Sequence, residues 1–334
     1  MAKTKRVDVH SHVFPQEMMD LIRQRPGDYG MKFEVRDGAD RLVRADGHAS
    51  PLFAEFHDAD AKVAGMDRKG LDISVISPSP MIYFYWLDAD RATASARAIN
   101  DGVARMVAKR PDRLRGMATL PMQNPDAAVA ELERVVKDHG FRAVEVGCTI
   151  MSEQLADKKF RPILKRAQEL KVFIFTHPHF TGDERCGLGP YYLGNLIGHP
   201  LDTVTMAAHM MFSGALDELP NLNIVLAHGG GYLPYQIGRL AHGYEVRKEP
   251  KVNKASSPRE LIRRFYFDGL THDVKALRFL IDQVGADRVT LGTDAPFDMG
   301  EEHPLDMLNA VTGLSEDQRD RIMGLNALGL LGEK

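Results

Sequence analysis

The chain has 334 residues, 44% of them hydrophobic and 27% charged, a composition that allows a large buried core. Its 43 Lys and Arg residues are balanced by 46 Asp and Glu residues, and the net charge of -3 argues against nucleic acid as a partner, because phosphate backbones bind basic surfaces. No run approaches about 18 apolar residues, and the start "MAKTKRVDVHSH" lacks the apolar segment of a secretion signal, so we expect a cytoplasmic protein with no membrane partner.

Short β-rich runs alternate with helical patterns along almost the whole chain. Eight runs predict strands, at residues 6–10, 73–78, 114–121, 142–148, 172–178, 223–230, 265–270 and 288–295. Segments between them, such as 126–140 and 273–285, carry apolar residues at helical spacing and close on a glycine. Strands separated by helices pair in parallel, which predicts an α/β fold with a distorted TIM-type (β/α)8 barrel as one domain over residues 1–334. A doubly wound open sheet would give a similar pattern.

Residues 27–56 interrupt the alternation after the first strand. The stretch "KFEVRDGADRLVR" places an Asp-Gly pair between two alternating runs, which predicts a β-hairpin inserted as a flap. Loops at the carboxyl end of barrel strands commonly cover the active site. The flap is therefore expected either to contact substrate or to be a surface excursion.

Metal-binding side chains follow several of the predicted strands. Strand one ends in "HSH", strand five in "THPH", strand six in "AHGGG" and strand eight in "GTDAPF", which contain His10, His12, His177, His179, His228 and Asp294. The carboxyl ends of barrel strands lie on one rim, and residues two apart in a strand point to the same face. Imidazole and carboxylate ligands suit zinc, and a position left open for water makes such a site catalytic.

Other histidines and the cysteines carry weaker signals. Those at 48, 57, 139, 199, 209, 242, 272 and 303 are expected to be structural or solvent-facing, although His179 and His272 follow strands and can line the same pocket. The two cysteines, Cys148 and Cys186, have no C-x-x-C spacing, which argues against a disulfide framework and a thiolate zinc site.

Four motifs occur in a characteristic order: "VDVHSHVFP", "THP", "SGALDELPNLNIVLAHGGGYLPYQIGR" and "RVTLGTDAPF". Over nearly the full chain this set resembles the amidohydrolase superfamily, and within it the branch of aminocarboxymuconate semialdehyde decarboxylase. The resemblance implies an eight-stranded barrel with one divalent metal, most often zinc, with manganese possible. It implies that the metal ligands are His10, His12, His177 and Asp294, and that His228 handles the metal-bound water.

The resemblance also implies a homodimer. The arginine of the "GR" pair after the "HGGG" helix, here Arg239, reaches into the neighbouring subunit's site in that family and binds a substrate carboxylate. Arg247 is a second candidate for the subunit contact.

One position departs from the family pattern. The namesake enzyme has an Arg-Pro pair in the flap as a second substrate clamp, whereas this chain has Ser50 before Pro51. Serine cannot reproduce the bidentate fork of arginine, which argues against the namesake substrate. Arg41 or Arg44 can substitute from elsewhere in the flap, or His48 and the aromatic run at 81–86 can shape a pocket for a flat ring.

The predicted activity is metal-dependent, non-oxidative decarboxylation of an aromatic, heteroaromatic or muconate-semialdehyde carboxylic acid. His228 is expected to act as acid and base with the metal-bound water, and Asp294 is an alternative proton donor to carbon. Phe297, Trp86 and His179 are expected to contact the substrate.

Two other functions are consistent with the motifs. A hydrolase or hydratase of the same superfamily would use the same ligands, but a second metal there is bridged by a lysine after strand four. The stretch "AVEVGCTI" offers Glu145 and Cys148 and no lysine, which favours one metal. A non-enzymatic metal-binding barrel would bind the ion without turnover.

Overall fold

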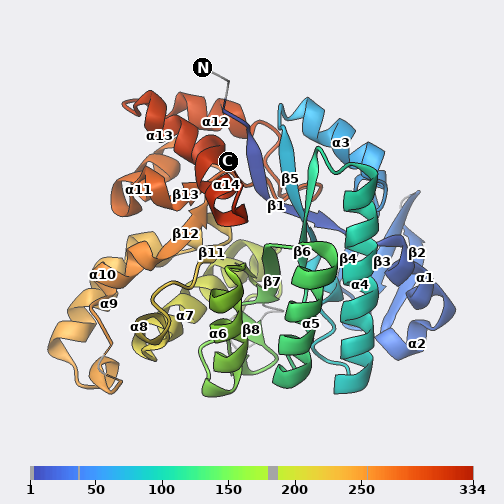
Figure 1. Ribbon diagram of the computed structural model, residues 1–334, viewed down its shortest axis with the longest axis horizontal. Helices are drawn as coiled ribbons and strands as arrows, with labels where there is room; N and C mark the ends of the chain where they lie inside the picture. The colour runs from blue at the N-terminus through green and yellow to red at the C-terminus, as the bar shows by residue number, and fades with distance from the viewer. Residues whose placement is uncertain (1–3, 37, 180–186, 254, 334) are drawn as a thin grey trace.

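A computed structural model of the chain describes residues 4–36, 38–179, 187–253 and 255–333. Eight parallel strands form one sheet, and helices surround it (Figure 1). The strands are β1 (Val7–Val13), β5 (Ile73–Pro78), β6 (Leu114–Ala118), β7 (Ala143–Gly147), β10 (Phe173–His177), β11 (Ile224–Leu226), β12 (Phe265–Asp268) and β13 (Val289–Thr290). Each pairs with the next in chain order, as a barrel requires.

The first strand returns to the last and closes the sheet. Parallel bridges join Asp8 to Leu291 and Ser11 to Ala295, and the His12 amide donates to the Ala295 carbonyl at 2.7 Å. The predicted (β/α)8 barrel is confirmed, and a doubly wound open sheet is excluded by the strand order. All eight predicted strands are present, although β11 and β13 are shorter than predicted and β1 extends three residues further, to Val13.

Amphipathic helices follow the strands and pack their apolar faces against the outside of the sheet. The longer ones are α1 (Gln16–Gln24), α3 (Ala59–Arg68), α4 (Ala89–Lys109), α5 (Pro125–His139), α6 (Arg161–Leu170), α7 (His199–Phe212), α9 (Leu233–Val246) and α11 (Val274–Val284). The shorter ones are α2 (Pro26–Tyr29), α8 (Ala215–Glu218), α10 (Pro258–Leu261), α12 (Pro304–Ala310), α13 (Glu316–Asp320) and α14 (Asn326–Leu331). Asn124 caps the start of α5 by accepting from the Ala127 amide, and Gly140 ends it with a positive φ, as the sequence pattern predicts. Among the described residues, no helix has the length and apolar character needed to cross a membrane.

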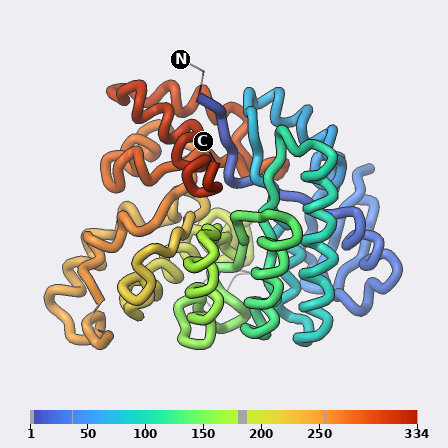
Figure 2. Tube along the Cα trace, in the orientation of Figure 1, coloured from blue at the N-terminus to red at the C-terminus, as the bar shows by residue number. Residues whose placement is uncertain are grey.

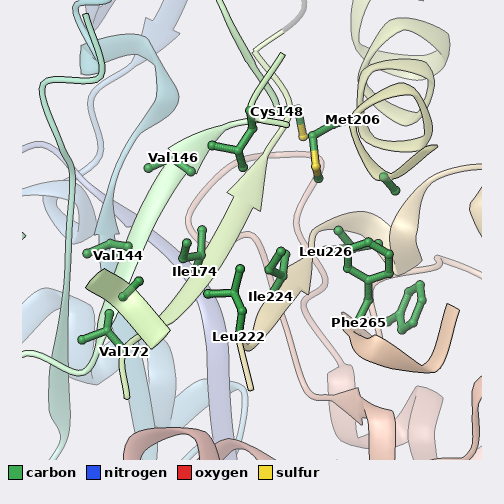
Figure 3. Close-up of a cluster of buried hydrophobic side chains, with 14 of the residues drawn as sticks. Val144, Val146, Cys148, Val172, Ile174, Met206, Leu222, Ile224, Leu226 and Phe265 are labelled. Carbon is green, nitrogen blue, oxygen red and sulfur yellow. The ribbon is translucent and has the colours of Figure 1, made fainter. Parts of the chain in front are cut away.

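Alternating strand residues separate two apolar layers. Ile174 of β10 points outward and packs with Val144, Ile224 and Met206 of α7 between the sheet and its helices (Figure 3). Phe173 and Phe175 point into the barrel. Each fully buried side chain of this size contributes about 1.5–3 kcal/mol, so both layers hold the strand register firmly.

The last helix closes one end of the barrel interior. Leu328, Leu330 and Leu331 of α14 belong to the same buried cluster as Val7 of β1 and Phe173. The start of β1 and the helix α14 lie at this same end of the barrel (Figure 2). The barrel interior is therefore packed with apolar side chains at its amino-terminal end, and the interior at the opposite end is left for a site.

The flap is a small antiparallel sheet. β2 (Met31–Arg36) pairs with β3 (Ala39–Arg44), which confirms the predicted hairpin, although Asp37 of its turn lies outside the described residues. A third strand, β4 (Ala49–Pro51), pairs with β3 and was not predicted.

A buried lysine ties β1 to the loop after β13. The Lys62 ammonium of α3 donates to the His12 carbonyl at 2.9 Å and to the Ala295 carbonyl at 3.1 Å. Burial lowers the pKa of Lys62 from 10.5 to about 8. In the interval between these values the unfolded chain holds a proton that the folded chain has lost, so raising the pH favours folding.

Replacing this lysine tests that linkage. The free energy of unfolding of the wild type, relative to that of Lys62→Met, should rise by about 2 kcal/mol between about pH 7.5 and about pH 10. Chemical denaturation at several pH values measures it. Lys165→Met, at an exposed position of α6, is the control and should show no such trend; a flat difference for Lys62→Met would contradict the assignment.

Candidate metal centre

Four side chains meet at the carboxyl end of the barrel. The ligand atoms of His10, His12, His177 and Asp294 all lie within 4.8 Å of one another, and all four residues are buried. His12 Nε2 lies 3.1 Å from His10 Nε2 and 3.0 Å from Asp294 Oδ1. The structure thus brings together the four residues predicted as ligands, from β1, β10 and the loop after β13.

An irregularity in β1 helps to aim both histidines. The pairing of β1 with β5 shifts register between Asp8 and Ser11. Val9 lies in the apolar cluster inside the barrel, and the next residue, His10, also faces inward with its ring 4.8 Å from that of Phe175. A regular strand would alternate these two positions, so the bulge turns the histidine toward the site.

The three imidazoles present the same nitrogen to the centre. His10 Nδ1 donates to Asp268 at 2.6 Å, and His177 Nδ1 donates to the Pro178 carbonyl at 2.8 Å. Ser77 Oγ donates to the Ser11 carbonyl and lies 3.2 Å from His12 Nδ1, from which it accepts. Each Nδ1 is thereby protonated, which leaves Nε2 of each ring as the atom that faces the centre and can bind a metal, as in metal-binding histidines.

Two of the four ligand atoms have no hydrogen-bond partner in the described part of the chain. His177 Nε2 and Asp294 Oδ1 are buried and make no hydrogen bond within the described residues. Burial opposes protonation of His10, but the carboxylates of Asp294 and Asp268 outweigh it and raise the pKa of His10 well above its usual value, so a proton occupies its Nε2 unless a bound cation replaces it. The same negative field favours a cation. Three neutral imidazoles and one carboxylate therefore fit a divalent metal.

The other predicted catalytic residue, His228, lies beside the centre. Its Nε2 is 3.6 Å from Asp294 Oδ2, and its ring centroid is 5.0 Å from that of His177. His228 and Asp294 have φ of 55° and 58°, a backbone region that non-glycine residues rarely adopt and that clusters at functional sites. The glycines after His228 also have positive φ, and a Cβ on Gly231 would collide with the Pro200 carbonyl. The "HGGG" motif thus allows α7 to approach the His228 loop.

A cavity of about 550 Å³ opens over the metal centre. His177 and Asp294 line its floor, with His179 and Phe297 beside them. Trp86 stacks on the His179 ring at 6.5 Å between centroids and so supports this wall without lining it. A larger cavity of about 870 Å³ lies at the amino-terminal end of the barrel and contains none of these residues.

The flap contributes to the cavity wall. Arg44, Asp46 and His48 line it, so the flap is part of the site and not a surface excursion. The Arg44 guanidinium lies 5.3 Å from the Trp86 ring centroid and pairs with Asp46. Arg41 does not line the cavity, and Ser50 is buried in β4 with its hydroxyl donating to the Pro51 carbonyl.

Some predicted residues lie elsewhere. Arg239 is exposed on α9 and does not line the cavity of its own chain. Arg247 pairs with Glu249 at the surface, and His272 is exposed. Cys148 is buried in the outer apolar layer (Figure 3), and Cys186 lies outside the described residues.

The structure adds residues that sequence reasoning missed. Asp268, at the end of β12, accepts from His10 and also from the Gly229 amide at 2.7 Å, so it links a predicted ligand to the His228 loop. Its position at a strand end was a usable signal. Glu145 lies 3.9 Å from His12 Nδ1 and accepts from the Tyr83 hydroxyl. Burial, reinforced by Glu145, raises the pKa of Tyr83 well above its usual value, which keeps this donor protonated.

His199 corrects one prediction. It was expected to be structural or solvent-facing, but it lines the cavity, with its ring 6.2 Å from those of His177 and His228. The sequence analysis selected site residues because they follow predicted strands, and His199 instead begins a helix, so its position did not mark it as a site residue.

Residues 7–332 match the Amidohydrolase family, Amidohydro_2. The chain belongs to this family. Among relatives, it is 32% identical to 2-amino-3-carboxymuconate-6-semialdehyde decarboxylase of Dictyostelium discoideum, over 99% of this chain and 92% of that one. It is also 32% identical to gamma-resorcylate decarboxylase of Rhizobium sp. (strain MTP-10005), over 96% of each.

A solved structure of another amidohydrolase shares the fold closely. Dihydroxybenzoic acid decarboxylase from Polaromonas sp. JS666, with bound manganese and the inhibitor 2-nitroresorcinol, superposes with a TM-score of 0.81 at 28% identity, covering 99% of this chain and 97% of that one. The resemblance to the amidohydrolase decarboxylases that the motifs indicated is thereby confirmed.

The contact between Asp268 and His10 predicts a loss of metal affinity on mutation. Asp268→Asn keeps the side-chain volume but removes the charge that orients His10, so metal affinity should fall by roughly 10- to 100-fold. Competition with a chelator measures it. Asp282→Asn, on the exposed face of α11, is the matched control, and equal affinity in the two variants would count against the role.

Proposed function

We propose that this amidohydrolase is a metal-dependent, non-oxidative decarboxylase of an aromatic or related unsaturated carboxylic acid. The observation that carries the proposal is the buried centre of three histidines and one aspartate at the floor of a cavity with aromatic and cationic walls. Two relatives that this chain matches over almost their full length are named decarboxylases, which supports the same reaction.

We infer that the metal is zinc, held by His10, His12, His177 and Asp294, although the related Polaromonas structure contains manganese. Three imidazoles and one carboxylate suit zinc, and manganese also accepts them. When bound, such an ion supplies a positive centre that orients a substrate oxygen and stabilises negative charge developing beside it.

The protein groups then handle the proton. His228 faces the same centre, and its Nε2 can take or deliver a proton next to the reacting carbon. The Asp294 carboxylate lies within 3.6 Å and can steady the imidazolium form of His228. Asp294 itself is the alternative donor to carbon, and both residues stay as proposed catalytic groups.

The cavity walls suggest how a flat acid is held. Phe297 and His179 offer ring faces, and Trp86 supports His179 from behind. Arg44 lines the cavity where Ser50 does not, which supports Arg44 as the flap residue that substitutes for the missing clamp. We infer a hydroxylated aromatic acid over the namesake semialdehyde, because the rings of Phe297 and His179 line the cavity and suit a flat ring.

We also propose a homodimer with shared sites. Arg239 is exposed on α9, together with Tyr235, one turn earlier, which is 80% exposed. The apolar side chains of Ile197, in the turn before α7, and of Leu201 in α7 are also exposed, and α7 packs against α9. A patch of this kind is typical of a subunit interface and would place Arg239 against a second copy. The cytoplasmic location remains a prediction.

The first test measures bound metal and released carbon dioxide on one preparation. About one metal per chain, with carbon dioxide released from hydroxylated benzoates, picolinates or muconate semialdehydes, is the expected result. Metal without carbon dioxide from any acid would move the assignment to a hydrolase or hydratase, and failure to bind metal after reconstitution would remove its basis.

Two histidine variants separate metal binding from chemistry. His177→Ala should lose most of the bound metal, because it removes one of four ligands. His228→Ala should keep the metal and lose at least about 100-fold in kcat, since it removes only the acid–base group. Metal analysis and steady-state kinetics measure both. Full activity in His228→Ala would overturn its assignment.

Hybrid dimers test the shared site. Arg239→Ala and His228→Ala proteins should each be nearly inactive alone, and a mixture should recover activity, because one of the two sites in each hybrid keeps both residues. No recovery after verified subunit exchange would contradict a contribution of Arg239 across the interface.

A further inference from the structure

The cavity over the metal centre is lined by a histidine, His199, that has no role in the proposed metal binding or proton transfer. His199 is the first residue of α7, and its ring lies nearly parallel to that of His228, with 6.2 Å between centroids and 23° between planes. It shares the cavity lining with His177 and Asp294. A ligand that reaches those two residues therefore passes within reach of His199.

The backbone on both sides is shaped for this approach. Residues Gly194–Gly198, before α7, form a π-helical turn, a rare conformation that is frequent at functional sites. On the other side, Gly231 leaves room for the Pro200 carbonyl, where any Cβ would collide. Two unusual local conformations thus bring the start of α7 against the His228 loop.

One hydrogen bond fixes the ring's tautomer. The Asn195 side-chain amide lies 3.3 Å from His199 Nδ1, and an amide N–H can only donate, so Nδ1 accepts. The proton of the neutral ring is then on Nε2. Burial, with His228 nearby, lowers the pKa of His199 to about 3, so the ring is neutral across the working range. Within the described residues, Nε2 makes no hydrogen bond.

We propose that His199 is a substrate-contact residue, whose Nε2–H donates a hydrogen bond to a substrate oxygen over the metal centre, with Asn195 as the positioning residue that sets its tautomer. This inference rests on the proposed decarboxylation. A neutral donor fixed in the cavity wall stabilises negative charge that develops on that oxygen and requires no proton transfer of its own. His228 remains the acid–base group.

The test compares four variants of the metal-loaded enzyme. His199→Ala should keep the metal and lose about 100-fold in kcat/KM on the best acid of the panel, as for removal of one oxyanion donor. His199→Gln, which restores an N–H donor but cannot titrate, should recover roughly 10-fold of that loss. Asn195→Ala should lose less kcat/KM than His199→Ala, because it keeps the imidazole and only removes the hydrogen bond that selects its tautomer. His209→Ala, exposed on the same helix, is the control and should match the wild type.

Binding of 2-nitroresorcinol, measured by calorimetry, separates this inference from the reaction. Weaker binding to His199→Ala than to the wild type supports the contact even if no acid is decarboxylated. Absence of decarboxylation alone would contradict the proposed function and not the role of His199. Unchanged kcat/KM and unchanged binding in His199→Ala would overturn the inference, as would loss of metal from that variant or an equal loss in His199→Gln. A wild-type protein that neither turns over nor binds the probe would overturn both.

Discussion

The structure depends on four ligand atoms that the protein directs at one point, and two of them, His177 Nε2 and Asp294 Oδ1, have no hydrogen-bond partner among the described residues. His10, His12 and His177 each use Nδ1 for a protein acceptor and present Nε2 inward, beside the Asp294 carboxylate. Unsatisfied buried polar atoms are costly, so a fold keeps such a cluster only where a cation compensates it. The barrel closure, the bulge in β1 and the buried Lys62 all serve to hold this geometry.

Much of this arrangement was predictable because it follows from topology. Parallel strands end on one rim, so His10, His177 and Asp294 were expected to meet although they lie far apart in the chain. The flap hairpin was predictable from its Asp-Gly turn. Apolar runs predicted where the strands lie but not where they end. The last strand was predicted over residues 288–295, whereas β13 ends at Thr290 and only isolated bridges continue its pairing.

Other features could not be predicted because they depend on tertiary contact. Glu145 lies inside β7, and nothing in "AVEVG" says that its carboxylate faces His12. His199 reaches the cavity through a π-helical turn, which shifts helix faces relative to the usual 3.6-residue period. Arg239 was predicted from family resemblance alone, and a single chain leaves it exposed.

The closure of the barrel has a consequence for biosynthesis. The ligands come from the first strand and from the loop after the last one, and the interior is completed only when α14 packs against β1. During synthesis, His10 and His12 are therefore made long before their carboxylate partner, Asp294. Tight metal capture therefore has to wait until Asp294 has been made and the barrel has closed on β1.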